Sequence, residues 1–213
     1  MLLAEELLVL AIDPRGGLVS VEGATATTRD GLVRALMAEL AARGAIAPDP
    51  YGLRVIDPLP LNHRLLTAAL RALGDASWTP HTAAAHLRRR LWTVRTELMD
   101  GLERNSITHR LGGGLFGVFR KARFALQSTQ TRASSIAKLR RGTTDPQLDD
   151  LDAVALALLC DISGLAAHFV TLDQRQQLRI WINTMKPSPI AVAGGLTSPR
   201  QRLAAIAAVM PQR

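Results

Sequence analysis

A short apolar segment in the middle of this chain is surrounded by cations. Burying a large apolar side chain is worth about 1.5–3 kcal/mol, whereas unpaired cations resist burial. Apolar residues among positive charges therefore suit a surface that is apolar inside and anionic outside, as a lipid bilayer is. The predicted membrane-inserting residues are Leu115, Phe116, Val118 and Phe119, and the flanking basic residues are Arg110, Arg120, Lys121 and Arg123.

A second group of residues with binding chemistry precedes this segment. If residues 79–104 form one helix, Trp92 and Arg95 follow Arg88 at i+4 and i+7 and share its face. The donors of a guanidinium match two phosphate oxygens, and an indole is suited to a lipid interface. The pattern predicts binding of a lipid head group. The alternative is that Trp92 packs inward and Arg95 is a solvated surface charge.

The positive charge is concentrated in one part of the chain. The net charge is +8, and residues 88–141 hold thirteen Lys or Arg against three acids, so the remaining residues sum to −2. Such a block implies an anionic partner, either lipid head groups, nucleic acid or an acidic protein. A solvated charged face is the simpler alternative.

Motifs for catalysis and metal binding are largely missing. The glycines of 112–117 match G-x-G-x-x-G, but no strong strand precedes them and no helix opens on them, so a hairpin tip is the better interpretation. His81 and His86 lack the i, i+4 spacing of a helical metal site. Cys160 lies in an apolar run and is expected to be a buried core thiol. The sequence predicts no catalytic residues, no metal and no cofactor, hence a protein that is not an enzyme.

Composition, periodicity and capping signals predict a mainly α protein with a short β-hairpin, as one domain over residues 1–213. The run that ends at Asp161 is expected to be the most buried helix, and extended pieces are expected at 45–47 and 53–56. The hairpin is predicted to pair Ile107–Arg110 with Leu115–Phe119. Helices are predicted at 2–10, Asp30–Arg43, Asn62–Leu73, Thr79–Arg104, Ala133–Arg141, Asp145–Asp161, Thr171–Met185 and Ser198–Met210.

Neither a membrane span nor a signal peptide is expected. Asp152 and Asp161 interrupt the longest apolar run, and the N-terminus has acids where a signal core would lie. A single cysteine fits a reducing compartment. We expect a soluble cytoplasmic protein whose membrane association is peripheral.

Several segments together resemble the Golgi phosphoprotein 3 family. Residues 3–13 (LAEELLVLAID) are similar to its opening helix and turn, and residues 149–159 (DDLDAVALALL) to its central helix. Gly31-Leu32 with 39–44 (ELAARG) resembles its second helix and the stop that follows. Residues 91–98 (LWTVRTEL), with Leu102-Glu-Arg and Ile107, resemble the helix that leads into the hairpin. The resemblance covers nearly the whole chain in order.

The resemblance implies a compact, mostly helical domain around a buried central helix bundle. It also implies binding of phosphatidylinositol 4-phosphate in a basic pocket, a hairpin that dips into the bilayer, and a role as an adaptor. Of the family's four pocket positions only Arg95 matches here, because Ala24, Val33 and Trp92 stand at the others. We therefore expect binding of anionic lipid in general more than of this phosphoinositide. The composition, rich in Ala, Leu and Arg, is typical of a bacterial member. The predicted head-group residues are Arg95, Trp92, Arg88 and Arg34, of which Arg34 is adjacent to a lost position.

Two other classes of function stay open. The stretches 40–46 and 102–107 both end a helix and lead into an extended pair, as in winged-helix proteins that bind nucleic acid. The hairpin could also be an interaction module that packs on a protein partner or on a second copy of the chain.

Overall fold

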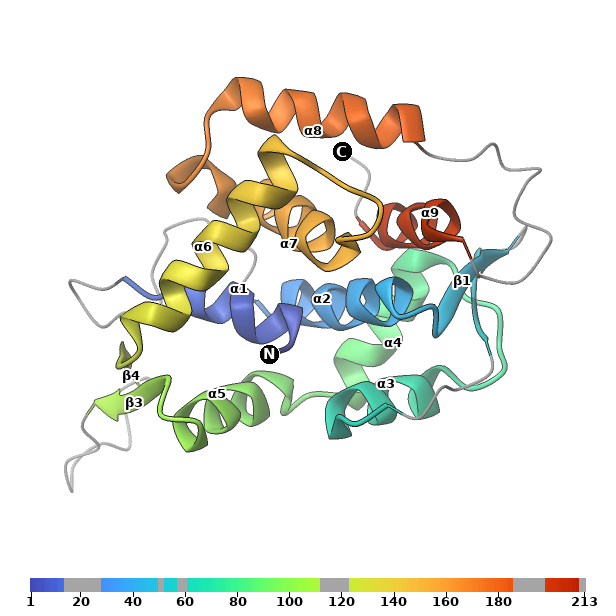
Figure 1. Ribbon diagram of the computed structural model, residues 1–213. Helices are drawn as coiled ribbons and strands as arrows, with labels where there is room; N and C mark the ends of the chain where they lie inside the picture. The colour runs from blue at the N-terminus through green and yellow to red at the C-terminus, as the bar shows by residue number, and fades with distance from the viewer. Residues whose placement is uncertain (14–27, 50–51, 57–60, 112–122, 186–197, 211–213) are drawn as a thin grey trace.

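Helices α1 (Leu3–Ala11) and α7 (Leu151–Ile162) form the centre of the fold (Figure 1). Every residue of α1 is buried, as are ten of the twelve residues of α7, because apolar residues surround the whole circumference of both helices. The computed structural model describes residues 1–13, 28–49, 52–56, 61–111, 123–185 and 198–210. The predicted mainly α fold with a buried central helix is confirmed.

The other helices cover this centre from two sides. Helices α6 and α2 pack against α1 and α7, α9 packs on α2, and α8 lies across α6 and α9. Helices α3, α4 and α5 cover the opposite side of α2. Their bounds are α2 (Arg29–Ala42), α3 (Arg64–Leu73), α4 (Pro80–Arg90), α5 (Val94–Arg104), α6 (Thr129–Thr144), α8 (Leu172–Met185) and α9 (Pro199–Val209), with a short 3-10 helix at Leu165–His168.

Two antiparallel strand pairs lie at the ends of the molecule. Strand β1 (Ile46–Asp49) pairs with β2 (Gly52–Val55) after α2, close to the predicted extended pieces. Strand β3 (Thr108–Leu111) pairs with β4 (Arg123–Leu126) after α5. Both pairs therefore follow a helix, as the sequence indicated.

The predicted helix Thr79–Arg104 is wrong, because α4 and α5 are separated by a turn at residues 91–93. Leu91 leaves the helical region with φ −105° and ψ 49°. A straight helix of this length would span about 39 Å at 1.5 Å per residue, nearly twice the length of α2. The turn lets both halves stay against α2 while Leu87 and Val94 remain fully buried.

Three other boundaries also differ from the prediction. The partner of β3 is 123–126 instead of 115–119, so the predicted pairing is wrong and the predicted tip belongs to the connection, outside the described residues. Helix α6 begins at Thr129, four residues before the predicted start. Helix α7 begins at Leu151, because Asp145 ends α6 and Asp150 is the residue that caps α7 by accepting from the Ala153 N–H.

The predictions for the last helices and for Cys160 are confirmed. Thr171 and Gln174 form the expected capping box before α8, and Ser198 caps α9. Cys160 is fully buried, and burial raises the pKa of its thiol far above the ordinary value. A neutral core thiol is what its apolar surroundings predict.

The close packing of α6 on α7 depends on Gly142. A Cβ at this position would lie 2.1 Å from the carbonyl oxygen of Ala153, which is backbone and cannot move aside cheaply. We expect Gly142→Ala to lower the free energy of unfolding by about 1–3 kcal/mol or more, as overpacking does. Urea denaturation measures this, with Ser134→Ala on the exposed side of α6 as a control. Equal stability of the two variants would contradict the packing described here.

A partly buried ion pair joins α1 to α6. Lys138 Nζ lies 2.8 Å from Glu6 Oε2, yet burial outweighs this attraction and raises the pKa of the Glu6 carboxyl above its ordinary value of 4.5. Between 4.5 and the raised pKa the folded chain binds more protons than the unfolded chain. The contribution of Glu6 to stability therefore falls as pH rises through this window.

We expect the stability of the natural chain, relative to Glu6→Gln, to decrease as pH rises from about 4.5 and then to level off. Urea unfolding of both proteins across this pH range measures the difference. Lys138→Met removes the cation that lowers this pKa, so the decrease should extend to higher pH in that variant. Parallel stability curves for the natural chain and Glu6→Gln would show that Glu6 does not titrate differently on folding.

Candidate functional site

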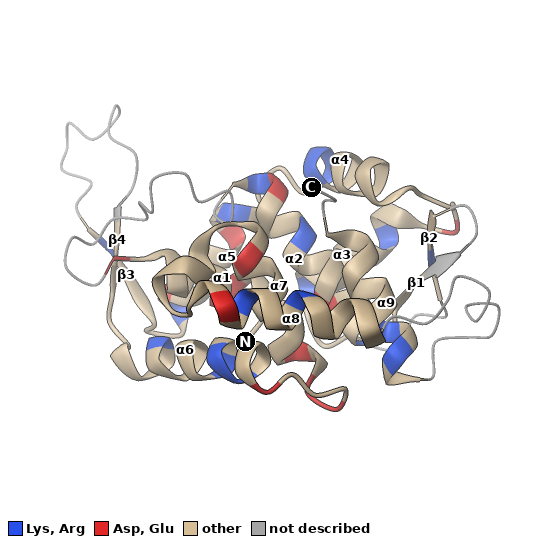
Figure 2. Cartoon of the chain, turned by 90° about the horizontal axis from the view of Figure 1, so that it is seen from above, with Lys and Arg blue, Asp and Glu red and all other residues tan. Residues whose placement is uncertain are grey.

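A group of exposed basic residues lies where α4 ends and α5 begins, and we call Arg88–Arg90, Trp92 and Arg95 the cationic surface. All four arginines are exposed, and α4 itself contains no acid. Figure 2 shows the basic segment at the end of α4. Among the residues that the structure describes, none of these guanidinium groups has an ion-pair or hydrogen-bond partner. Their charge is available to a ligand.

Helix electrostatics explain the position of one half of this surface and not the other. Arg88–Arg90 occupy the last turn of α4, where cations stabilise the helix dipole. Arg95 lies in the first turn of α5, where a cation is unfavourable. Helix stability therefore does not account for Arg95, and this favours a role in binding.

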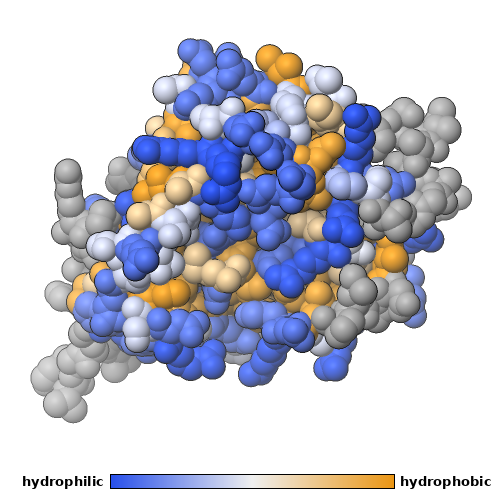
Figure 3. Space-filling model, viewed as in Figure 1, coloured by the Kyte–Doolittle hydropathy of each residue, from blue (hydrophilic) through white to orange (hydrophobic). Residues whose placement is uncertain are grey.

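Trp92 is the most exposed large apolar side chain of the described residues, with 68% of its surface accessible. It lies in the turn between α4 and α5, while its neighbour Leu91 is buried. Its indole makes no aromatic or cation–π contact within the described part of the chain. The alternative that Trp92 packs inward is wrong. On the face seen in Figure 3, hydrophobic residues appear as small groups among hydrophilic ones. Ile180 is exposed to nearly the same degree, at 66%, so the arginines near Trp92 in the sequence are what distinguish this indole.

The structure does not place the predicted head-group residues on one helix face. The turn at 91–93 separates Arg88 from Arg95, so the i, i+7 relation does not hold. Arg34 lies on α2, with a side chain that is 12% exposed. Its Nε donates to Asp30 Oδ2 at 2.8 Å and its Nη1 donates to the Val209 carbonyl at 3.0 Å. Arg34 thus ties α2 to the end of α9.

The base of the hairpin is described, whereas its predicted tip is not. Arg110 lies 3.2 Å from Asp100 and 5.4 Å from the centre of the Phe124 ring, so its charge is partly engaged. Leu111 is 36% exposed and pairs with Arg123. The residues that lie outside the described ranges are Leu115, Phe116, Val118, Phe119, Arg120 and Lys121.

Glu5 and Glu6 lie in the first turn of α1, where the helix dipole favours acids, and the sequence patterns predict no role for them in a site. In the structure both are buried, with 8% and 6% of their surface exposed. The signal was present, because these two acids interrupt an otherwise apolar run from Leu2 to Ile12. Charges that must be buried with a helix need partners, and such positions are candidates for function.

The described residues give no support for a metal site or for a membrane-spanning helix. No group of three or more His, Cys, Asp or Glu side chains there could hold a metal ion. None of the described helices has the length and apolar character that crossing a bilayer requires. His86 is placed structurally, since its Nε2 donates to the Ala72 carbonyl at 3.0 Å and its ring contacts Trp78.

These features define a mainly helical protein with an exposed cationic surface, next to a helix that leads into a hairpin. The family model of Golgi phosphoprotein 3 (GPP34) matches residues 3–193, and the chain belongs to this family. Membership is consistent with a lipid-binding or adaptor role and with a protein that is not an enzyme. A comparison with curated protein sequences found no match.

The different surroundings of the arginines predict different effects on stability. Arg34→Ala should lower the free energy of unfolding by about 1.5–3 kcal/mol, because it removes the charged hydrogen bonds that this nearly buried side chain donates to Asp30 and Val209. Arg88→Ala and Arg95→Ala should change it by less than about 0.5 kcal/mol. Urea denaturation of the three variants measures this. If Arg88→Ala were destabilised and Arg34→Ala were not, the assignment of Arg34 to a structural role and of Arg88 to binding would be wrong.

Proposed function

We propose that this chain is a peripheral membrane protein, located in the cytoplasm, that binds anionic lipid through the cationic surface. The observation that carries the proposal is Trp92, an exposed indole within four residues in sequence of four exposed arginines that have no partners in the described part of the chain. Membership in the Golgi phosphoprotein 3 family supports the same class of function.

The physical chemistry of a membrane surface fits this arrangement. Each basic residue near an anionic bilayer contributes about 1 kcal/mol of attraction. Guanidinium groups can donate two hydrogen bonds to one phosphate, and indoles favour the level of the head groups. Four arginines attract the surface, and Trp92 adds an apolar contact that survives when salt screens the charges.

The hairpin supplies the second part of the proposal. Its base, β3 and β4, follows directly from α5, which carries Arg95. The apolar residues of its connection, Leu115, Phe116, Val118 and Phe119, are proposed from the sequence to insert into the bilayer. An anchor of this kind combines with basic residues because a single weak membrane signal gives only reversible binding.

The proposed ligand is anionic lipid in general, with no preference for one phosphoinositide. Of the family's pocket positions only Arg95 is matched, and Arg34 is held by Asp30 and α9. Without a closed set of donors, recognition depends on charge density more than on the pattern of phosphates. We propose a role as an adaptor or anchor without catalytic activity.

Liposome co-sedimentation tests this proposal. Arg88→Gln/Arg89→Gln/Arg90→Gln should weaken binding to anionic vesicles by tenfold or more, since about 1 kcal/mol is lost with each charge. Trp92→Ala should weaken it further and make the remaining binding more sensitive to salt. A charge-matched control, Arg54→Gln/Arg140→Gln/Arg200→Gln, changes three exposed arginines on other elements and should retain most of the binding.

Equal loss in the two triple variants would mean that net charge alone drives binding, and would contradict a specific surface. Binding to neutral vesicles as strong as to anionic ones would also overturn the proposal. Steeply salt-dependent binding of double-stranded DNA, with no affinity for vesicles, would favour the nucleic-acid alternative. Loss of binding together with loss of a dimer on changing Phe116 and Phe119 would favour an interaction module.

A further inference from the structure

One buried carboxylate in the described part of the chain lacks a positive partner. Four acidic side chains there are more than nine-tenths buried. Glu6 pairs with Lys138, Glu39 with Arg43, and Asp161 with Arg179 and Arg175. Glu5, of which 8% is exposed, has no cation within ion-pair distance among the described residues. A buried charge without a counter-charge is costly unless something else compensates it.

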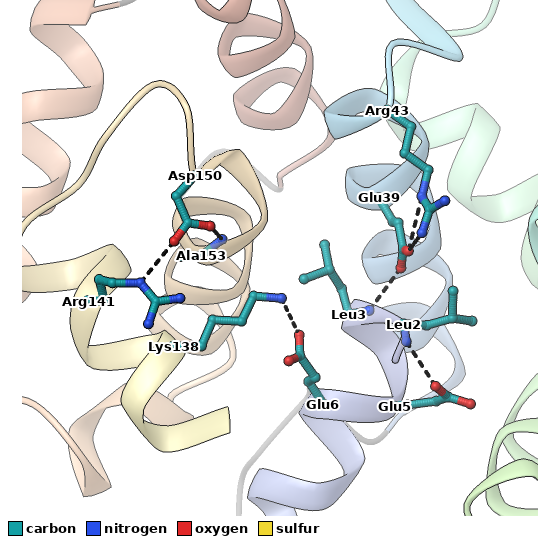
Figure 4. A network of polar contacts seen from close by, with 10 residues as sticks. All are labelled: Leu2, Leu3, Glu5, Glu6, Glu39, Arg43, Lys138, Arg141, Asp150 and Ala153. Carbon is teal, nitrogen blue, oxygen red and sulfur yellow. Dashed lines mark hydrogen bonds and ion pairs between the residues drawn. The ribbon is translucent and has the colours of Figure 1, made fainter. Parts of the chain in front are cut away.

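The hydrogen bonds of Glu5 occupy only one of its two oxygens. Its Oε2 accepts from the Leu2 N–H at 2.8 Å, which caps the start of α1. Its Oε1 has no partner among the described residues. Figure 4 shows the Glu5 side chain leaving α1 on the side opposite to Glu6, away from Lys138. The ion pair of the neighbouring acid therefore does not neutralise it.

The free oxygen of Glu5 faces a groove between α3 and α5. The groove has a volume of about 610 Å³, and Glu5, Gly101 and the start of α3 line it. A Cβ placed on Gly101 would lie 3.3 Å from Glu5 Oε1 and 3.9 Å from Arg104 Nη2. Glu5 Oε1 and Arg104 Nη2 therefore both lie close to Gly101, on the same part of the groove.

The groove also offers sites for a negative charge. Arg64, in the first turn of α3, has no partner among the described residues and lines the groove. The Leu65 N–H of this turn is already capped by His63 Nδ1 at 3.2 Å, so the Arg64 guanidinium is the donor available to an anion. Arg104 uses its Nε on the Asp100 carbonyl at 3.3 Å, so its Nη groups remain available. The two other acids of the groove are engaged, Glu97 with the Thr93 hydroxyl and Asp100 with Arg110.

We propose that this groove binds a zwitterion, with a primary ammonium group on Glu5 and a phosphate group between Arg64 and Arg104. The ammonium would donate to Glu5 Oε1 and supply the counter-charge that the buried carboxylate lacks. A simple anion would meet three carboxylates, and a simple cation would meet two arginines. A molecule with both charges satisfies each set. This proposal is independent of the cationic surface at the junction of α4 and α5.

Phosphoethanolamine is the probe that tests the groove. Isothermal titration calorimetry of the whole chain should show saturable binding of phosphoethanolamine, and much weaker binding of ethanolamine or inorganic phosphate alone. Phosphocholine, whose quaternary ammonium cannot donate a hydrogen bond, should bind about tenfold more weakly, the loss expected for one charged hydrogen bond. Vesicles of phosphatidylcholine with and without phosphatidylethanolamine then distinguish a lipid head group from a soluble ligand.

Two variants change the groove while the chain should stay folded. Glu5→Gln keeps an oxygen that can accept from the Leu2 N–H, and it should weaken the binding of phosphoethanolamine by about tenfold. Gly101→Ala leaves every charge in place and fills the base of the groove, and it should also weaken binding. Alanine is the better helix former, so this variant should remain folded. Thr96→Ala, an exposed change on α5 outside the groove, is the matched control.

Three outcomes would overturn the proposal. The first is the absence of saturable binding of phosphoethanolamine by the natural chain, in solution and in vesicles. The second is unchanged affinity in both Glu5→Gln and Gly101→Ala. The third is equal affinity for phosphoethanolamine and inorganic phosphate, which would leave no role for Glu5. Vesicle binding can fail in the cationic-surface variants while binding to the groove persists, so the two proposals fail separately.

Discussion

The burial of α1 is the constraint from which much of this structure follows. A helix that is enclosed along its whole length must satisfy the N–H groups of its first turn inside the protein. The chain solves this with acids, since Glu5 accepts from the Leu2 N–H and Glu39 of α2 accepts from the Leu3 N–H at 2.8 Å. These carboxylates then need positive charges of their own. Arg43 meets Glu39, and Lys138 of α6 meets the adjacent Glu6, so the polar end of α1 links it to α2 and α6 (Figure 4).

The same constraint explains where the remaining cations lie. Among the described residues, the buried acids already have cationic partners, except Glu5. Further arginines can only remain in water or bind anionic groups from outside. The chain gathers a group of them at the junction of α4 and α5, where the turn that keeps Leu87 and Val94 buried also exposes Trp92. Packing therefore explains why position 92 is exposed. It does not explain why the exposed residue is a tryptophan, since a smaller or more polar residue would fit there equally well.

Much of the fold was predictable because its signals are local. Capping residues such as Thr171 and Ser198 determine where α8 and α9 begin, and the long apolar run identifies α7 as a helix although it does not give its start. The turn at 91–93 was not predictable in this way, since no proline or glycine marks it and the apolar spacing of Leu87, Leu91, Val94 and Leu98 also suits one continuous helix. It follows from tertiary packing against α2. The arginines of the cationic surface were predicted by type, but the role of Arg34 depends on Val209, which is 175 residues away.

The groove could not be predicted from the sequence either, because it too depends on tertiary packing. A sequence shows that Glu5 lies in an apolar run, but only the fold shows that its neighbours Glu6 and Glu39 obtain cations and that it does not. Helix α5 connects this groove to the cationic surface, because Arg95 lies in its first turn and Gly101 and Arg104 lie in its second half. The charged residues of the cationic surface are all arginines, whereas acids and arginines together line the groove. The cationic surface acts at long range and is weakened by salt, whereas Glu5, of which 8% is exposed, acts at short range through hydrogen bonds. A purely anionic group suits the cationic surface and a zwitterion suits the groove, so α5, which leads into the hairpin base, can contact two different chemical groups.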